Sequence, residues 1–270
     1  MSAKMERLAI LRTMALTSLQ AEFQYRANVI ASIIGGFAYQ LTGFIVVWIV
    51  VDRFDGLGGW TLAQITFLYG MRLTAHGIFY LCFSQMFDFD RVLISGEFDR
   101  YLVRPMSPLL QLFTRKLRVN CFGDLIGGAA LLSVAATGAG IDWSPASVAL
   151  LVAAVIGGAL VEGAVQVTMG SLGFRFLNIQ SARVSTNEVF NLYGNYPMTM
   201  FPRVLEYLLT FALPVAFVAY FPASTILGRG DELSVSPLLG WLAPLIGVVL
   251  FTIAVRVWSR QSRHYQSSGS

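Results

Sequence analysis

The sequence is poor in charged residues, histidine and cysteine. Charged residues make up 13% of the 270 residues, against ~25% in soluble domains. Two histidines cannot build a multi-histidine metal or haem site. Cys82 and Cys121 lie in apolar surroundings without CxxC or metal-type spacing, which predicts buried, unpaired thiols. The G-x-x-x-x-G-K-[ST] phosphate loop, the H-E-x-x-H zinc motif and the G-x-S-x-G elbow are missing. The sequence therefore predicts no catalytic or metal-binding residues.

Apolar residues are abundant instead, and they make up 56% of the chain. A soluble protein of this composition would have too few polar side chains to cover its surface. Intrinsic disorder is excluded by the 20 Phe, 10 Tyr and 5 Trp residues. The net charge of +4 is small enough to follow from basic cytoplasmic loops, so it does not indicate nucleic acid binding. The composition predicts a membrane protein.

Six apolar stretches reach the ~20 residues that a helix needs to cross ~30 Å of hydrocarbon. Crossing segments of this length must be helical, because open strands would leave backbone groups unpaired in lipid. We therefore predict an all-α membrane protein with six transmembrane helices, in one transmembrane domain over residues 1–270. The predicted spans are residues 28–51, 62–83, 119–138, 148–172, 204–221 and 237–258.

The positions of Lys and Arg predict the orientation. If both termini are cytoplasmic, sixteen of the 19 Lys and Arg residues, Arg203 among them, lie on the inner side. Only Arg53 and Arg229 then lie outside, and Arg72 lies within a span. This asymmetry is what the positive-inside rule requires, so both termini are predicted to face the cytoplasm.

Two further segments are predicted to be helical. Residues 4–26 carry apolar side chains at helical spacing between charges, which is typical of an amphipathic helix in the headgroup layer. The alternative is a frayed extension of the first span. Residues 178–202 are too polar for a crossing exposed to lipid. They form either a cytoplasmic helix or the inner half of a long, broken fifth span.

Ionisable residues inside predicted spans are costly and usually have a role. Arg72 and His76 lie one turn apart on the second span, and Glu162 lies at mid-depth of the fourth. Ala154 and Gly158 continue a stripe of small residues from Glu162, which would allow close helix approach. The simplest interpretation is an Arg72–Glu162 pair that locks the two spans together. The alternative is a polar patch that lines a substrate path.

The loop at residues 84–118 is unlike an ordinary linker. Apolar residues recur between charges of both signs, Gly96 can interrupt a helix, and Pro105 and Pro108 can end one. The pattern predicts a short amphipathic helix at the membrane surface. Aromatic and aliphatic anchors facing the cytosol would suit a docking element for a soluble partner.

This loop resembles a motif of the type-2 ABC exporter permeases, in the branch related to daunorubicin-resistance permeases. The matching residues are Ser95-Gly96-Glu97-Phe98-Asp99-x-Tyr101-Leu102-x-Arg104-Pro105-x-Ser107-Pro108-Leu109. Weaker matches elsewhere are Tyr25-Arg26-Ala27-Asn28, Tyr196-Pro197, Leu213-Pro214-x-Ala216-Phe217 and Pro222-Ala223.

The resemblance implies the permease subunit of an ATP-driven exporter in the bacterial inner membrane. It also implies two permease chains, identical or different, and separate nucleotide-binding ATPase subunits that hold ATP and Mg²⁺, with no cofactor in this chain. Residues 4–26 would be the interfacial helix and residues 84–118 the coupling loop. The ATPase contact would be made by Gly96, Glu97, Asp99, Arg100, Arg104 and Pro105.

A stand-alone secondary transporter or channel is the competing interpretation. It would work without an ATPase and would place Arg72, His76 and Glu162 at the centre of function. Purification separates the two, because an exporter permease copurifies with a soluble chain that carries a Walker motif. A membrane-embedded transferase is disfavoured, because carboxylates and histidines are not clustered.

Overall fold

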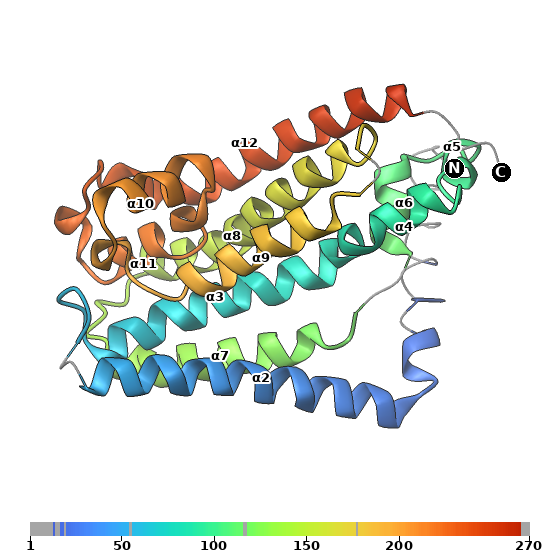
Figure 1. The fold of residues 1–270 in the computed structure, drawn as a ribbon. Helices are drawn as coiled ribbons and strands as arrows, with labels where there is room; N and C mark the ends of the chain where they lie inside the picture. Colours follow the sequence, from blue (N-terminus) through green and yellow to red (C-terminus); the bar gives the residue numbers. More distant parts are fainter. Residues whose placement is uncertain are drawn as a thin grey trace.

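The chain folds into a bundle of helices (Figure 1). The computed structural model describes residues 13, 17–18, 20–53, 56–115, 118–176 and 178–265. Helix accounts for 79% of the described residues, and these contain no strand. The predicted all-α class is confirmed. The long helices are α2 (Arg26–Arg53), α3 (Leu62–Phe83), α7 (Cys121–Gly138), α8 (Pro145–Leu172) and α12 (Leu238–Gln261).

Two long helices begin at capping boxes that can be recognised in the sequence. At the start of α3, the Thr61 hydroxyl accepts from the backbone N–H of Gln64. The side-chain oxygen of Gln64 accepts in turn from the backbone N–H of Thr61. Ser144 and Ser147 make the same reciprocal pair at the start of α8, where Pro145 occupies the first turn. These bonds satisfy backbone donors that a helix start leaves free.

Four helices are long and apolar enough to cross a membrane: α2, α7, α8 and residues Leu238–His264. A fifth candidate, Arg203–Ala212 with Val215–Ile226, is bent by 73° at its break. Helix α3 has the predicted bounds of the second span but is not among these candidates, because polar side chains lower its hydropathy. The count of six crossings and the cytoplasmic orientation of the termini stay predictions.

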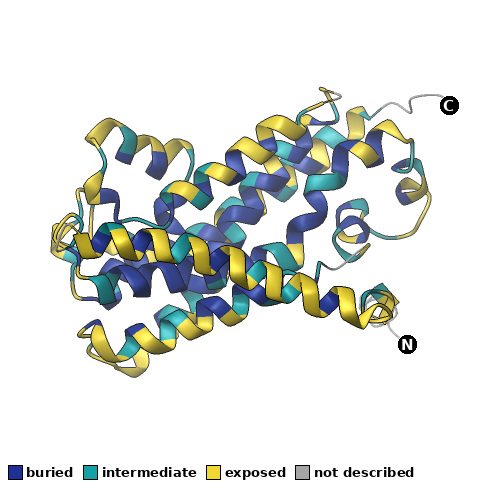
Figure 2. Cartoon of the chain, turned by 60° about the horizontal axis from the view of Figure 1, so that its bottom comes forward, coloured by how far each residue is buried: buried dark blue, intermediate teal, exposed yellow. Residues whose placement is uncertain are grey.

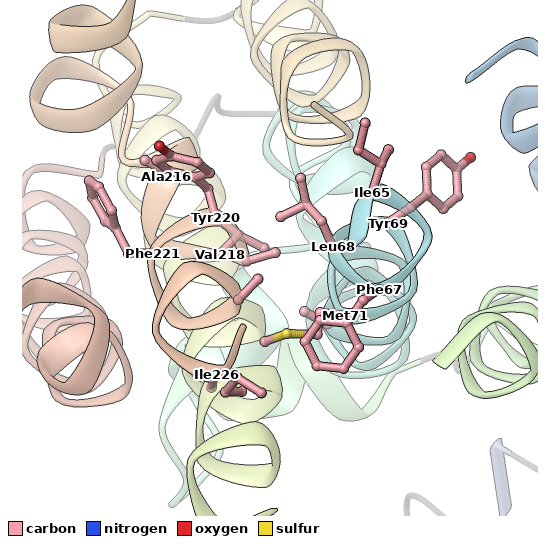
Figure 3. Packing of buried hydrophobic residues seen from close by; sticks show 14 of the residues in the cluster. Ile65, Phe67, Leu68, Tyr69, Met71, Ala216, Val218, Tyr220, Phe221 and Ile226 are labelled. Carbon is pink, nitrogen blue, oxygen red and sulfur yellow. The ribbon is translucent and has the colours of Figure 1, made fainter. Parts of the chain in front are cut away.

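Helix α3 lies at the centre of the bundle, packed between α7 and α8. Most of its residues are buried, including Thr66, Arg72 and His76. Figure 2 shows burial concentrated in these inner helices, whereas α2 is exposed along most of its length. Figure 3 shows part of the buried hydrophobic cluster: Leu68 points toward Val218, and Tyr69 points to the opposite side of α3, toward α2. The neighbouring helices thus shield α3 from lipid.

Residues 178–202 run along the bundle, and this segment contains α9 (Gln180–Tyr193). Arg183 contacts Met86 in the 84–118 loop, Asn191 contacts Arg72 in the middle of α3, and Thr199 lies beside Gly58 at the opposite end. Figure 1 shows α9 next to α8 and α3. The segment thus reaches from the 84–118 loop to the opposite end of the bundle, and its place in a broken fifth span stays a prediction.

The predicted fifth span, residues 204–221, is not one straight helix. It consists of α10 (Arg203–Tyr207), the π-helical η3 (Leu208–Ala212), η4 (Val215–Phe217) and α11 (Tyr220–Ile226). Pro214 lies at the break and cannot donate a backbone hydrogen bond. Glu206 accepts from Ser234, in the loop before α12. Arg203 therefore lies at the opposite end of the bundle from residues 84–118, and not at the same end as predicted.

The predicted interfacial helix, residues 4–26, lies largely outside the described residues. Residues 20–23 are helical, and a turn at residues 24–25 separates them from α2. The Ser18 hydroxyl donates to the carbonyls of Thr114 and Arg115 at 3.0 and 3.2 Å. The described part is thus a separate segment that contacts the 84–118 loop, rather than an extension of α2. Of the two cysteines, Cys121 is buried as predicted, but Cys82 is exposed; both are free.

Helices α8 and α12 make the most extensive helix contact, and glycine allows it. A Cβ atom at Gly247 would lie 2.3 Å from the Gly157 carbonyl oxygen, and one at Gly157 would lie 2.5 Å from the Pro244 Cα. Small residues permit this close backbone approach in a bilayer, where association depends on van der Waals packing.

Gly247→Ala should therefore lower the free energy of unfolding by ~1–3 kcal/mol, because the backbones must separate. Gly35→Ala is the matched control, since a Cβ atom there meets no atom within 4 Å. Reversible unfolding of the two variants in detergent tests the difference. Equal stabilities would contradict the close packing of α8 on α12.

Candidate functional site

The 84–118 loop forms a compact helical element at one end of the bundle (Figure 1). It contains η1 (Ser84–Asp88), α4 (Phe89–Ile94), α5 (Asp99–Leu102) and α6 (Pro108–Thr114). Gly96 has a φ of 69° in the turn between α4 and α5, a conformation that glycine adopts without strain. The predicted interruption at Gly96 is confirmed. Pro108 begins α6 instead of ending a helix.

An aromatic cluster attaches this element to the bundle. Phe89 lies 4.6 Å from Trp258 at the end of α12, and Phe98 lies 5.2 Å from Phe174 beyond α8, between ring centroids. Tyr265 packs on Phe98 at 5.0 Å. The two pairs of Phe98 are edge-to-face, a geometry that is favourable beyond its buried area, and the Phe89–Trp258 pair is tilted.

Most of the apolar anchors of the loop therefore face inward. Val92, Leu93, Phe98, Tyr101 and Leu109 are all buried. The prediction that the anchors face the cytosol to dock a partner is wrong for these five residues, because the bundle itself covers them. Leu102 and Leu110 of the same pattern are exposed. Burial also raises the pKa of the Tyr101 phenol above its ordinary value, so the group stays protonated near neutral pH.

A buried ion pair adds a polar attachment between the loop and α9. Arg183 lies 2.8 Å from Asp90, and both side chains are almost fully buried. Arg183 also donates to the Met86 carbonyl, and Asp90 accepts from the Ile179 N–H at 3.2 Å. Sequence reasoning missed this pair, because Asp90 and Arg183 are remote in the sequence. A signal was the single Arg on the otherwise uncharged first half of α9.

The exposed tip of the element lies between α4 and α6. Arg100, Arg104 and Pro105 are exposed, whereas Gly96, Glu97 and Asp99 are half-buried. Arg115 lies 2.8 Å from Glu97, so part of the predicted contact set is engaged within the loop. Exposed apolar side chains interleave with the charges. They are Ile94, Leu102 and Val103, of which Val103 is 84% exposed. We call residues 94–95, 100 and 102–105 the coupling tip.

The intramembrane charges pair differently from the prediction. His76 Nδ1 lies 2.6 Å from Glu162 Oε2, and both side chains are buried between α3 and α8. Arg72 instead donates to the Asn191 amide oxygen of α9. The predicted Arg72–Glu162 pair is wrong, because the partner of Glu162 is His76. His76 supplies the connection between the second and fourth predicted spans.

Arg72 lines a groove between α2, α3 and α9. The groove has a volume of about 400 Å³, and Tyr69 and Arg72 are buried on its α3 side. Gln40 comes from α2, and Asn191 and Tyr196 from the α9 segment. His76 and Glu162 are not among the lining residues. The three predicted intramembrane residues therefore fall into two separate sites.

Neither the coupling tip nor the groove, both built from described residues, contains a cluster of metal-ligating side chains. Within the described residues, no three His, Cys, Asp or Glu side chains lie close enough to hold a metal ion. The groups present are hydrogen-bonding side chains, one buried cation in the groove and exposed charges on the coupling tip. Such groups can bind a ligand or a protein partner.

Removing one partner of the His76–Glu162 pair should destabilise the bundle. His76→Leu leaves the Glu162 carboxylate buried without its partner, a change that typically costs ~3–5 kcal/mol. The double variant His76→Leu/Glu162→Leu removes both polar groups and should recover most of this loss. Unfolding in detergent measures both. Equal losses in the single and double variants would show that the pair does not join α3 to α8.

The chain was also compared with known proteins. A family model described as "ABC-2 family transporter protein" matches residues 37–269. The match begins within α2 and includes the 84–118 loop, the groove residues and α12. No curated protein matches the chain.

Proposed function

We propose that this chain, which belongs to the ABC-2 transporter family, is the transmembrane permease subunit of an exporter powered by separate ATPase subunits. The family and the apolar helices identify a multi-pass membrane component of an ABC transporter. The proposal adds the bacterial inner membrane, a second permease chain and the daunorubicin-related branch. In it, α9 and the following residues make the fifth of six crossings, and both termini are cytoplasmic.

The observation that carries the proposal is the combination of an exposed tip with a rigid base in the 84–118 loop. Its apolar anchors are buried against α8 and α12, and Asp90 is paired with Arg183 of α9. The coupling tip remains free of such internal contacts and carries Arg100, Val103 and Arg104 on its surface. Exposed arginines interleaved with apolar side chains suit an interface with a soluble protein.

The base of the loop also offers a route for movement. A force on the coupling tip would pass through Asp90 to Arg183 and so to α9. Asn191, two turns further along α9, accepts from Arg72 in the groove. In the proposed mechanism, ATP closes the paired ATPases, the coupling tips move with them, and a path opens between α2, α3 and α9. ATP shifts this equilibrium only as far as the two permease states differ in affinity for the closed ATPases.

The stand-alone transporter is less well supported. It needs Arg72, His76 and Glu162 to act together, but His76 and Glu162 pair with each other away from the groove. Only Arg72 is left to face a substrate path. A hydrogen-bonded pair buried on both sides fits a structural connection between helices better than a moving proton relay.

The test is charge reversal on the coupling tip in the complex with its ATPase subunits. Arg104→Glu should weaken ATPase binding by about tenfold, equal to ~1.4 kcal/mol, and should lower transport-linked ATP hydrolysis accordingly. Asp99→Arg, at the base of the tip, should act in the same direction. Copurification and ATP hydrolysis measure the effect.

Arg53→Glu is the matched control, because Arg53 is also exposed and lies at the opposite end of the bundle. It should assemble and hydrolyse ATP like the wild type. If Arg104→Glu and Asp99→Arg leave both assembly and hydrolysis unchanged, the docking assignment is wrong.

A further inference from the structure

We infer that the groove between α2, α3 and α9 binds an anionic amphiphile, with the acidic head group on Arg72 and the apolar tail toward the lipid. This inference deepens the proposed function, on which it rests, by assigning a substrate class to the groove. Three observations support it: Arg72 has no ion-pair partner among the described residues, its hydrogen bond is to a neutral amide, and apolar side chains lie at the open edge of the groove.

Arg72 is a buried cation without a counter-ion. Its side chain is 1% exposed, and its one hydrogen bond is to the neutral amide of Asn191. None of the ion pairs among the described residues includes Arg72. Its Nε atom is buried and makes no hydrogen bond. An unpaired cation at membrane depth is costly, so an anion bound there would remove a large penalty.

The groups around Arg72 suit an acidic head group. The guanidinium is a fork of N–H donors that matches the oxygens of phosphate or carboxylate. Asn195 also lines the groove, and its amide oxygen is buried without a donor. A protonated oxygen of a phosphate ester could donate to it. The one carboxylate of the lining, Glu188, is exposed and therefore lies toward the rim.

The open edge of the groove carries apolar side chains beside Tyr39, Thr42 and Glu188. Val46 of α2 and Leu192 of α9 line it and are 52% and 60% exposed. Helix α2 continues this surface with exposed Ile45 and Ile49. A free inorganic anion would gain nothing from these side chains, whereas an alkyl chain could lie along them in contact with lipid. The combination therefore selects an amphiphile over a free anion.

The experiment measures equilibrium binding of labelled dodecyl phosphate to the permease–ATPase complex in phosphatidylcholine nanodiscs, below micellar concentration. Empty nanodiscs give the background. Dodecyl maltoside tests whether the tail alone is sufficient, and inorganic phosphate tests whether the head alone is. We expect saturable binding of dodecyl phosphate, at least tenfold tighter than that of either comparison compound.

Arg72→Gln should weaken the binding of dodecyl phosphate at least tenfold. Asn191→Asp should do the same while keeping the arginine, because the new carboxylate occupies the guanidinium. Arg229→Gln is the matched control, since it removes an arginine that does not line the groove, and it should bind like the wild type. The second variant keeps the test informative if Arg72→Gln does not fold.

Three results would overturn the inference: no saturable binding, equal binding of dodecyl maltoside or inorganic phosphate, or wild-type affinity in both groove variants. Failure of the proposed function looks different. In that case the chain does not assemble with an ATPase, and the binding measurement on the chain alone still decides whether the groove holds the amphiphile.

Discussion

The arrangement of the bundle depends on the burial of one polar helix. Helix α3 carries Arg72 and His76 and is not apolar enough to pass as a lipid-exposed crossing. It must therefore be covered on several sides, and α7 and α8 do this through close contacts. At Gly128 of α7, a Cβ atom would lie 2.8 Å from the Thr74 nitrogen of α3. Apolar helices such as α2 are then left at the outside, where their side chains can face lipid.

The central position of α3 also links the groove to the 84–118 loop. Because α3 is central, its polar side chains contact α8 on one side, through Glu162, and α9 on the other, through Asn191. Helix α9 also holds the base of the 84–118 loop through Arg183. A movement at the coupling tip and a change around Arg72 therefore share one helix. This is the structural basis for proposing that the loop controls access to the groove.

The sequence predicted the elements that depend on local patterns. The bounds of α3 follow from its apolar stretch, and the break in the loop follows from Gly96. It failed where the answer depended on packing between distant segments. Spacing on one helix cannot show whether Glu162 meets Arg72 or His76, since the two residues lie only one turn apart. The inward-facing anchors of the loop were misread for the same reason. Their partners, Phe174 and Trp258, are remote in the sequence.

The central claim, that the coupling tip contacts an ATPase subunit, is tested most directly by site-specific photocrosslinking. A photoreactive phenylalanine analogue replaces Val103, which is 84% exposed on the tip, or Val134, which is 69% exposed on α7. The account predicts a crosslink from position 103 to a chain that carries a Walker motif, and none from position 134. The absence of that crosslink, or labelling of position 103 from the outer side of the membrane, would contradict it.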